Sequence, residues 1–175
     1  MKPFAKRLCA SVLSLLFVVT DLSKGVAALT ESQLKVALLY KFAQFTVWPA
    51  LADEAFDFCI LGENRFGEDL DALVGKKLHD KPLKITYPAT PEAARGCQLA
   101  YLNFPDAKQF AHWIDILASA PVLTVSESPD AWRKGVMVVF EVEPNGVSFS
   151  INLTAARGAN LSLSAQMLKL AKDVR

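Results

Sequence analysis

The strongest constraint on the fold is an alternation of apolar and polar residues near the carboxyl end of the chain. It covers residues 147–154 and has a period of two, which is typical of a β-strand with one face on a core and the other toward water. An apolar run at residues 136–140 precedes it, and the intervening turn contains Asn145 and Gly146, which tolerate the backbone angles of tight turns. The two runs therefore predict an antiparallel hairpin.

Strands and helices alternate through the remainder of the chain. Short apolar runs typical of strands occupy residues 56–61, 83–87, 99–104 and 121–125, and helical spacing marks residues 66–73, 110–117 and 162–174. Such alternation favours a largely parallel sheet with helices on both faces. We expect a single-domain α/β sandwich, with a mixed, largely parallel sheet to which the hairpin adds an antiparallel edge.

The amino terminus has the three-part form of a secretory signal. Basic residues precede the apolar run of residues 8–19, and small residues lead to a cleavage site after Ala28. We expect residues 1–28 to be a signal peptide and residues 29–175 to be the mature domain, exported to the periplasm. An uncleaved membrane anchor is the alternative, although the apolar run is shorter than the roughly 20 residues that a span needs.

The charge of the mature chain argues against nucleic-acid binding. The full sequence has 19 basic and 18 acidic residues, and the signal peptide holds four of the basic residues and one of the acidic residues. The mature chain therefore has a net charge of −2. A nucleic-acid-binding domain normally carries a basic excess, so we expect no nucleic-acid partner.

The first mature helix begins with a capping box. Thr30 and Gln33 are spaced so that the side chain of each can accept a hydrogen bond from the backbone amide of the other. The helix is expected to end near Thr46, because Pro49 disfavours helical geometry in the residue before it. In the simpler interpretation, the apolar stripe of this helix packs on the sheet of the same domain. In the alternative interpretation, part of the stripe is a partner surface that includes Tyr40 and Trp48, since these residue types are enriched at interface hot spots.

Two cysteines, Cys59 and Cys97, remain after export. In an oxidising compartment they are expected to form a disulfide if the strands at residues 56–61 and 99–104 are neighbours. A metal site is the alternative, but it needs further ligands, and His79 and His112 are the only histidines.

Catalytic and nucleotide-binding signatures are missing from the sequence. Residues 62–67 lie between a strand and a helix but lack the glycine spacing of a dinucleotide-binding turn, so a tight turn is the favoured interpretation. Neither histidine belongs to a known catalytic motif. We therefore expect no enzyme and no cofactor.

A small-ligand-binding function is a second hypothesis. It rests on polar side chains on and after the alternating strand, where amides and a guanidinium can hold a carboxylate or phosphate. The candidate residues are Ser150, Asn152, Arg157 and Asn160. Turn formation and ordinary solvent exposure explain the same residues without a ligand.

Segments distributed over the mature chain resemble the YfiR family of periplasmic proteins. They are residues 35–49, 58–67, 121–126, 150–156, 161–164 and 168–171, in this order. The resemblance implies an α/β sandwich without catalysis, stabilised by a cysteine pair that matches Cys59 and Cys97. It also implies a homodimer.

The function implied by the resemblance is regulatory. A YfiR-like protein holds an inner-membrane diguanylate cyclase inactive by binding its periplasmic portion, and an outer-membrane lipoprotein sequesters the YfiR-like protein. The expected outcome is control of cyclic di-GMP signalling and biofilm formation. The candidate contact surface comprises Tyr40, Trp48, Ser150, Asn152, Arg157 and Asn160.

Overall fold

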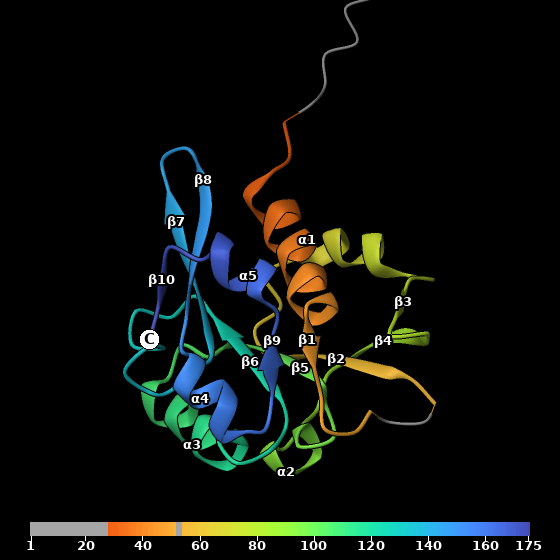
Figure 1. Cartoon of the computed structure of the whole chain (residues 1–175), viewed down its shortest axis with the longest axis vertical. Coiled ribbons are helices and arrows are strands. Elements are labelled where there is room, and N and C mark those ends of the chain that lie inside the picture. The colour runs from red at the N-terminus through yellow and green to blue at the C-terminus, as the bar shows by residue number, and fades with distance from the viewer. Residues whose placement is uncertain (1–27, 52–53) are drawn as a thin grey trace, which may run out of the picture.

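A mixed sheet of eight strands forms the centre of the protein (Figure 1). The computed structural model describes residues 28–51 and 54–175, so the predicted signal peptide lies outside the described residues apart from Ala28. The strand order is β10-β8-β7-β6-β5-β2-β4-β3. The strands are β2 (Phe56–Gly62), β3 (Lys77–Leu78), β4 (Lys81–Thr86), β5 (Leu99–Asn103), β6 (Leu123–Ser126), β7 (Val138–Glu143), β8 (Gly146–Ile151) and β10 (Asp173–Val174).

The middle of the sheet is parallel, as the alternation of strands and helices predicts. Strands β4, β2, β5, β6 and β7 pair in parallel, whereas β7–β8 and β3–β4 are antiparallel. The α/β sandwich expected from the sequence is therefore confirmed.

Helices cover both faces of this sheet. One face packs against α1 (Glu31–Gln44), the 3-10 helix η1 (Gly67–Leu73), α4 (Leu153–Gly158) and α5 (Ala165–Leu170), and the other against α2 (Pro91–Ala94) and α3 (Ala107–Leu117). Successive side chains of a strand point to opposite faces, so Phe58 and Ile60 join the first core while Leu61 joins the second. The strands are apolar on both sides because both sides are buried.

The capping box at the start of α1 is confirmed. The Gln33 amide donates to Thr30 Oγ1 at 3.1 Å, and the Thr30 amide donates to Gln33 Oε1 at 3.2 Å. The helix ends at Gln44, close to the expected position.

The predicted disulfide is also present. Cys59 lies in β2 and Cys97 directly precedes β5, and these strands are neighbours in the sheet. Their Cα atoms are 6.0 Å apart, and the bond joins positions separated by 38 residues.

The prediction of a closing helix over residues 162–174 is wrong. Only Ala165–Leu170 is helical, because Ser164 caps α5 at its start and Ala171 returns to extended geometry. The residues before α5 form β9 (Ser162–Leu163), and those after it form β10, which pairs in parallel with β8. The Lys172 amide donates to the Phe149 carbonyl, so the chain end satisfies backbone groups of β8.

Strand β10 changes the role of the hairpin. The hairpin forms as predicted, with its turn between Glu143 and Gly146, but it is not the edge of the sheet because β10 lies outside it. The alternating strand ends at Ile151, and the following residues, expected to be a turn, form helix α4.

Candidate functional site

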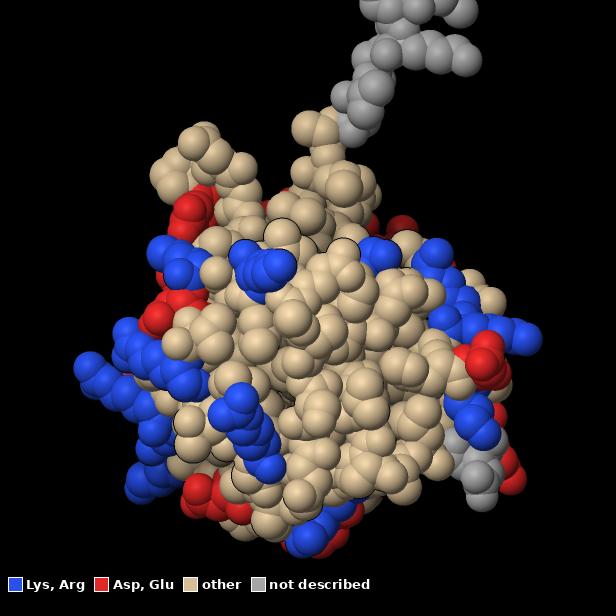
Figure 2. Space-filling view, in the orientation of Figure 1, with Lys and Arg blue, Asp and Glu red and all other residues tan. Residues whose placement is uncertain are grey.

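One face of the protein is almost free of charged side chains at its centre (Figure 2). This surface extends over α1, α5 and a small two-stranded sheet, in which β1 (Thr46–Val47) pairs antiparallel with β9. Lysine and arginine side chains lie around its margin (Figure 2). Exposed apolar patches mark interaction sites more often than ordinary solvent-exposed surface does, so the apolar residues of this face are the ones of interest.

Four apolar residues of these elements define what we call the front face. They are Phe45, Val47, Leu168 and Leu170. Val47 and Leu170 are 62% and 67% exposed, and the other two are half-buried against the core. The front face therefore presents large apolar side chains on a framework that the core holds in place.

The backbone explains why Val47 points outward. Thr46 is paired with Leu163 and is buried, so the next residue of the strand must face the opposite side. The Ser164 amide donates to the Phe45 carbonyl at 2.9 Å, which ties the start of α5 to the end of α1.

The two aromatic residues predicted to face a partner lie in different environments. Trp48 is only 6% exposed, stacks edge-on against Phe56, and donates from Nε1 to the Gln98 carbonyl at 3.1 Å. The interpretation of Trp48 as a surface contact is therefore corrected: it belongs to the core. Tyr40 is half-buried beside η1, and its hydroxyl donates to the Lys77 carbonyl at 2.9 Å.

Ser150 lines a polar groove of about 430 Å³ beside β10. Its hydroxyl donates to Glu141 Oε1 at 2.5 Å, and Lys172 forms ion pairs with both Glu141 and Glu143. Arg175 and Trp132 also line this groove, and the Arg175 guanidinium lies over the Trp132 ring. Because these polar groups already have protein partners, the groove shows no set of free donors aimed at a ligand.

The other polar candidates do not join Ser150 in one site. Asn152 accepts from the Ala155 amide at 2.9 Å and so caps α4. Arg157 is exposed near the end of that helix, and Asn160 is exposed in the following turn with a φ of 59°. Capping and turn geometry account for Asn152 and Asn160 without a ligand.

Sequence reasoning missed a buried network of charges. Lys35 of α1 donates a hydrogen bond to Glu127, which directly follows β6. It donates a second hydrogen bond, of 2.5 Å, to Glu31 one turn earlier in α1. The buried Tyr101 hydroxyl of β5 donates to the other oxygen of Glu127 at 2.8 Å. Arg65, after β2, lies 3.9 Å from the same oxygen.

This network lies where ligands often bind in α/β proteins. Chain order reverses between β2 and β5, and such switch points at the carboxyl ends of strands are common binding sites. The cavity beside the network, lined by Lys35, Arg65 and Glu127 among others, measures about 170 Å³, which is smaller than most small-molecule sites. Its charges are paired with one another, so the network joins α1 to the sheet.

The pKa shifts agree with a stabilising ion pair. Burial alone would lower the pKa of Lys35, but the hydrogen bonds to Glu127 and Glu31 outweigh burial and hold the pKa above its ordinary value. Burial alone would raise the pKa of Glu127, but hydrogen bonds from Lys35 and Tyr101 outweigh it and hold that pKa below its ordinary value. Burial, together with the charge of Glu127, raises the pKa of Tyr101.

Neither a cluster of metal-binding side chains nor a membrane-spanning helix is found in the part of the chain that the structure describes. Within residues 28–51 and 54–175, no group of three or more His, Cys, Asp or Glu side chains is placed to hold a metal ion. None of the helices described there has the length and apolar character that a membrane span requires.

A solved structure from Vibrio cholerae O1 biovar eltor, described as a conserved domain protein, has a similar fold. The two share 11% sequence identity with a TM-score of 0.57, and the match covers 84% of this chain and 61% of the other. The chain thus spans less than two thirds of that protein, and the similarity shows the fold alone. No curated protein matches the sequence.

A comparison with protein families identifies the chain more directly. Residues 32–172 match the family described as YfiR/HmsC-like, so the match runs from the first turn of α1 to the residue before β10. It includes the disulfide, the buried charge network apart from Glu31, and the whole front face. The chain belongs to the YfiR/HmsC-like family.

Proposed function

We propose that this protein is a periplasmic regulator without enzymatic activity that binds a protein partner through its front face. By that binding it represses an inner-membrane diguanylate cyclase and so controls cyclic di-GMP and biofilm formation. Membership of the YfiR/HmsC-like family supports this proposal. An outer-membrane lipoprotein that competes for the regulator is a second partner in the same scheme.

The uncharged front face is the observation that carries the proposal. Val47 and Leu170 are large, apolar and more than half exposed. Burying such side chains against a partner contributes roughly 25 cal/mol per Å² of apolar surface removed from water. A fixed apolar surface with few charges at its centre resembles the core of a protein interface, and basic side chains such as Lys41, which lies over the Phe45 ring, resemble the polar rim.

Charged substitutions on the front face are expected to abolish repression. In cells that lack the chromosomal gene, the variant with both Val47→Asp and Leu170→Asp should fail to lower cyclic di-GMP, because its two carboxylates would have to be buried without partners. The measurement is intracellular cyclic di-GMP by mass spectrometry, with periplasmic protein level determined by immunoblot.

Val142→Asp is the matched control. Val142 is 55% exposed on the β7–β8 hairpin and is not part of the front face, so this variant should repress like the wild type. Equal repression by the front-face variant and the wild type, at equal protein levels, would argue against this surface.

A further inference from the structure

Helix α1 carries a second apolar stripe in addition to the one that packs on the sheet. The side that faces the core includes Val36 and Leu39. The second stripe consists of Leu34, Ala37 and Leu38, in which Ala37 is exposed and the two leucines are half-buried. A surface helix normally presents polar residues toward water, so this apolar stripe indicates a binding surface.

This stripe forms one wall of a groove between α1 and η1. The groove measures about 710 Å³, within the range of roughly 300–1,000 Å³ that is typical of small-molecule sites. Its lining includes Leu34, Leu38 and Tyr40 of α1 and Leu73 of η1. Leu29, which is 65% exposed, lies at its amino-terminal end. The groove is on the η1 side of α1, whereas the front face is formed with β1, β9 and α5.

Helix η1 runs beside α1 in the same direction. Phe66, directly before η1, lines one small cavity with Glu31 and Ser32 at the start of α1. Lys76, after η1, lies with Nζ 5.6 Å from the ring centre of Tyr40, in the second half of α1. One end of the groove is therefore near the start of both helices, and the other end is near their carboxyl ends.

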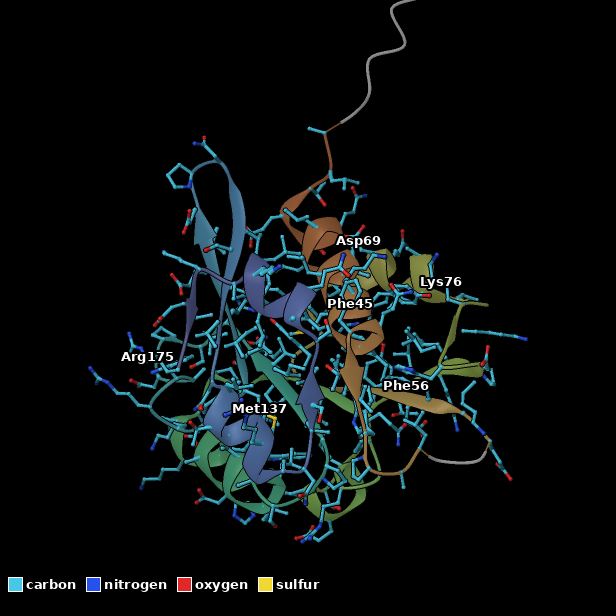
Figure 3. All side chains as sticks on the ribbon, in the orientation of Figure 1. Phe45, Phe56, Asp69, Lys76, Met137 and Arg175 are labelled. Carbon is cyan, nitrogen blue, oxygen red and sulfur yellow. A yellow bond between two sulfur atoms is a disulfide. The ribbon has the colours of Figure 1, made fainter. Side chains whose placement is uncertain are left out.

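The two ends of the groove differ in charge. Glu68 and Asp69, in the first turn of η1, line one end. Lys41 and Lys76 line the other end, and Figure 3 shows Asp69 and Lys76 apart along the η1 side of α1. Lys41 Nζ already donates to Gln44 at 2.9 Å. Lys76 forms no ion pair within residues 28–51 and 54–175, so its charge is available to a bound anion.

We propose that the groove binds a fatty acid, with the carboxylate at Lys76 and the alkyl chain along the apolar stripe of α1. The Lys76 ammonium attracts the carboxylate, whereas Glu68 and Asp69 repel it from the other end, and this difference sets the orientation of the ligand. The chain is removed from water between α1 and η1, which is the favourable term of apolar binding. An anionic membrane surface would instead require basic residues along the whole groove.

The first test compares two fatty acids of different chain length. Dodecanoate and octanoate are titrated into the exported mature protein below their micelle-forming concentrations, and binding is measured by isothermal titration calorimetry. Each fully buried methylene group strengthens binding by about fourfold, so dodecanoate, which has four more of them, should bind about tenfold or more tightly than octanoate.

Lys76 variants test the position of the carboxylate. Lys76→Met keeps an apolar stem but removes the charge, and it should weaken dodecanoate binding by about fivefold, as expected for a partly solvated ion pair. Lys76→Arg keeps the charge and should bind like the wild type. Lys108→Met, at an exposed position of α3 on the other side of the sheet, is the matched control and should leave binding unchanged.

A substitution that fills the groove tests the position of the chain. Ala37→Trp places a large side chain at the middle of the apolar stripe and should weaken dodecanoate binding by about tenfold or more, because it occupies the space of several methylene groups. Ala118→Trp, at the exposed carboxyl end of α3, should leave binding unchanged. Circular dichroism of all variants checks that the fold is retained.

Three outcomes would overturn the proposal. The first is the absence of saturable dodecanoate binding to the wild type, and the second is equal affinity for dodecanoate and octanoate. The third is dodecanoate binding that Lys76→Met or Ala37→Trp leaves unchanged, which would place the ligand elsewhere. These results are read on purified protein, so they are independent of whether the front face represses a cyclase.

Discussion

Removing the disulfide is expected to lower the free energy of unfolding by about 4 kcal/mol, the loop-entropy value for a bond between positions 38 residues apart. The variant with Cys59→Ala and Cys97→Ala should therefore unfold at lower urea concentration. At roughly 2–4 °C per kcal/mol for a protein of this size, its melting temperature should fall by about 8–16 °C. The bond has this effect because it links β2 to the start of β5 and restricts the unfolded chain.

Reduction provides the control for the disulfide prediction. A thiol reductant should shift the wild type to the stability of the double variant and should leave the variant itself unchanged. A loss below 1 kcal/mol in the variant, or an equal response of both proteins to the reductant, would contradict a stabilising role for the bond between Cys59 and Cys97.

Breaking the buried ion pair is expected to have a comparable effect. Lys35→Met removes the cation from Glu127, whose side chain is only 16% exposed, and the loss of one partner of a buried pair costs about 3–5 kcal/mol. Adding Glu127→Gln to the same chain should recover most of this loss, because the uncompensated charge disappears while Tyr101 keeps an oxygen acceptor. Urea unfolding at pH 7 measures both variants.

Lys41→Met serves as the matched control for this pair. Lys41 is exposed on the same helix, so the substitution should change stability by no more than about 0.5 kcal/mol. A loss under 1 kcal/mol for Lys35→Met would show that the contact between α1 and Glu127 contributes little to folding.

The cost of Lys35→Met should depend on pH. In the wild type the pKa of Glu127 is below its ordinary value of 4.5, so the pair stabilises the fold above that pH and its contribution falls as pH falls through the folded pKa. In the variant the buried carboxylate lacks its cation, its pKa rises, and protonation relieves the penalty. The stability difference between variant and wild type should therefore be smaller at pH 4 than at pH 7.

Local patterns explain how much of the fold could be predicted. The capping box at Thr30, the strands around Cys59 and Tyr101, and the hairpin turn at Gly146 each depend on residues close together in sequence, and the structure confirms them. Strand β10 could not be predicted in this way, because a strand of two residues is too short to show an alternation of apolar and polar side chains. Its residues are extended only through pairing with β8.

The candidate site was less predictable for the same physical reason. Lys35 and Glu127 are 92 residues apart, and no local pattern links them. A charged residue among the apolar residues of α1 is the only sequence signal of that network. Trp48 was misplaced because a tryptophan at the end of an apolar stripe fits a core and an interface equally well, and its position was decided by packing on Phe56.

Front-face residues are likewise recognised only in three dimensions. Val47 lies beside Ser162, from the opposite end of the domain, because β1 pairs with β9. Leu170 was expected within a long closing helix, but it is the last residue of the short α5 and is 67% exposed. The front face thus depends on β1, β9 and the short α5, which the sequence did not predict, as well as on α1, which it did.

Cyclic di-GMP in cells with and without the gene is the most direct measurement of the proposed regulatory role. The strain is one that carries an inner-membrane diguanylate cyclase with a periplasmic portion, and the gene is deleted in frame. Repression predicts that cyclic di-GMP and biofilm rise in the deletion strain and return to the starting level when the wild-type gene is restored. Unchanged cyclic di-GMP after deletion, with the cyclase present and active, would contradict the account.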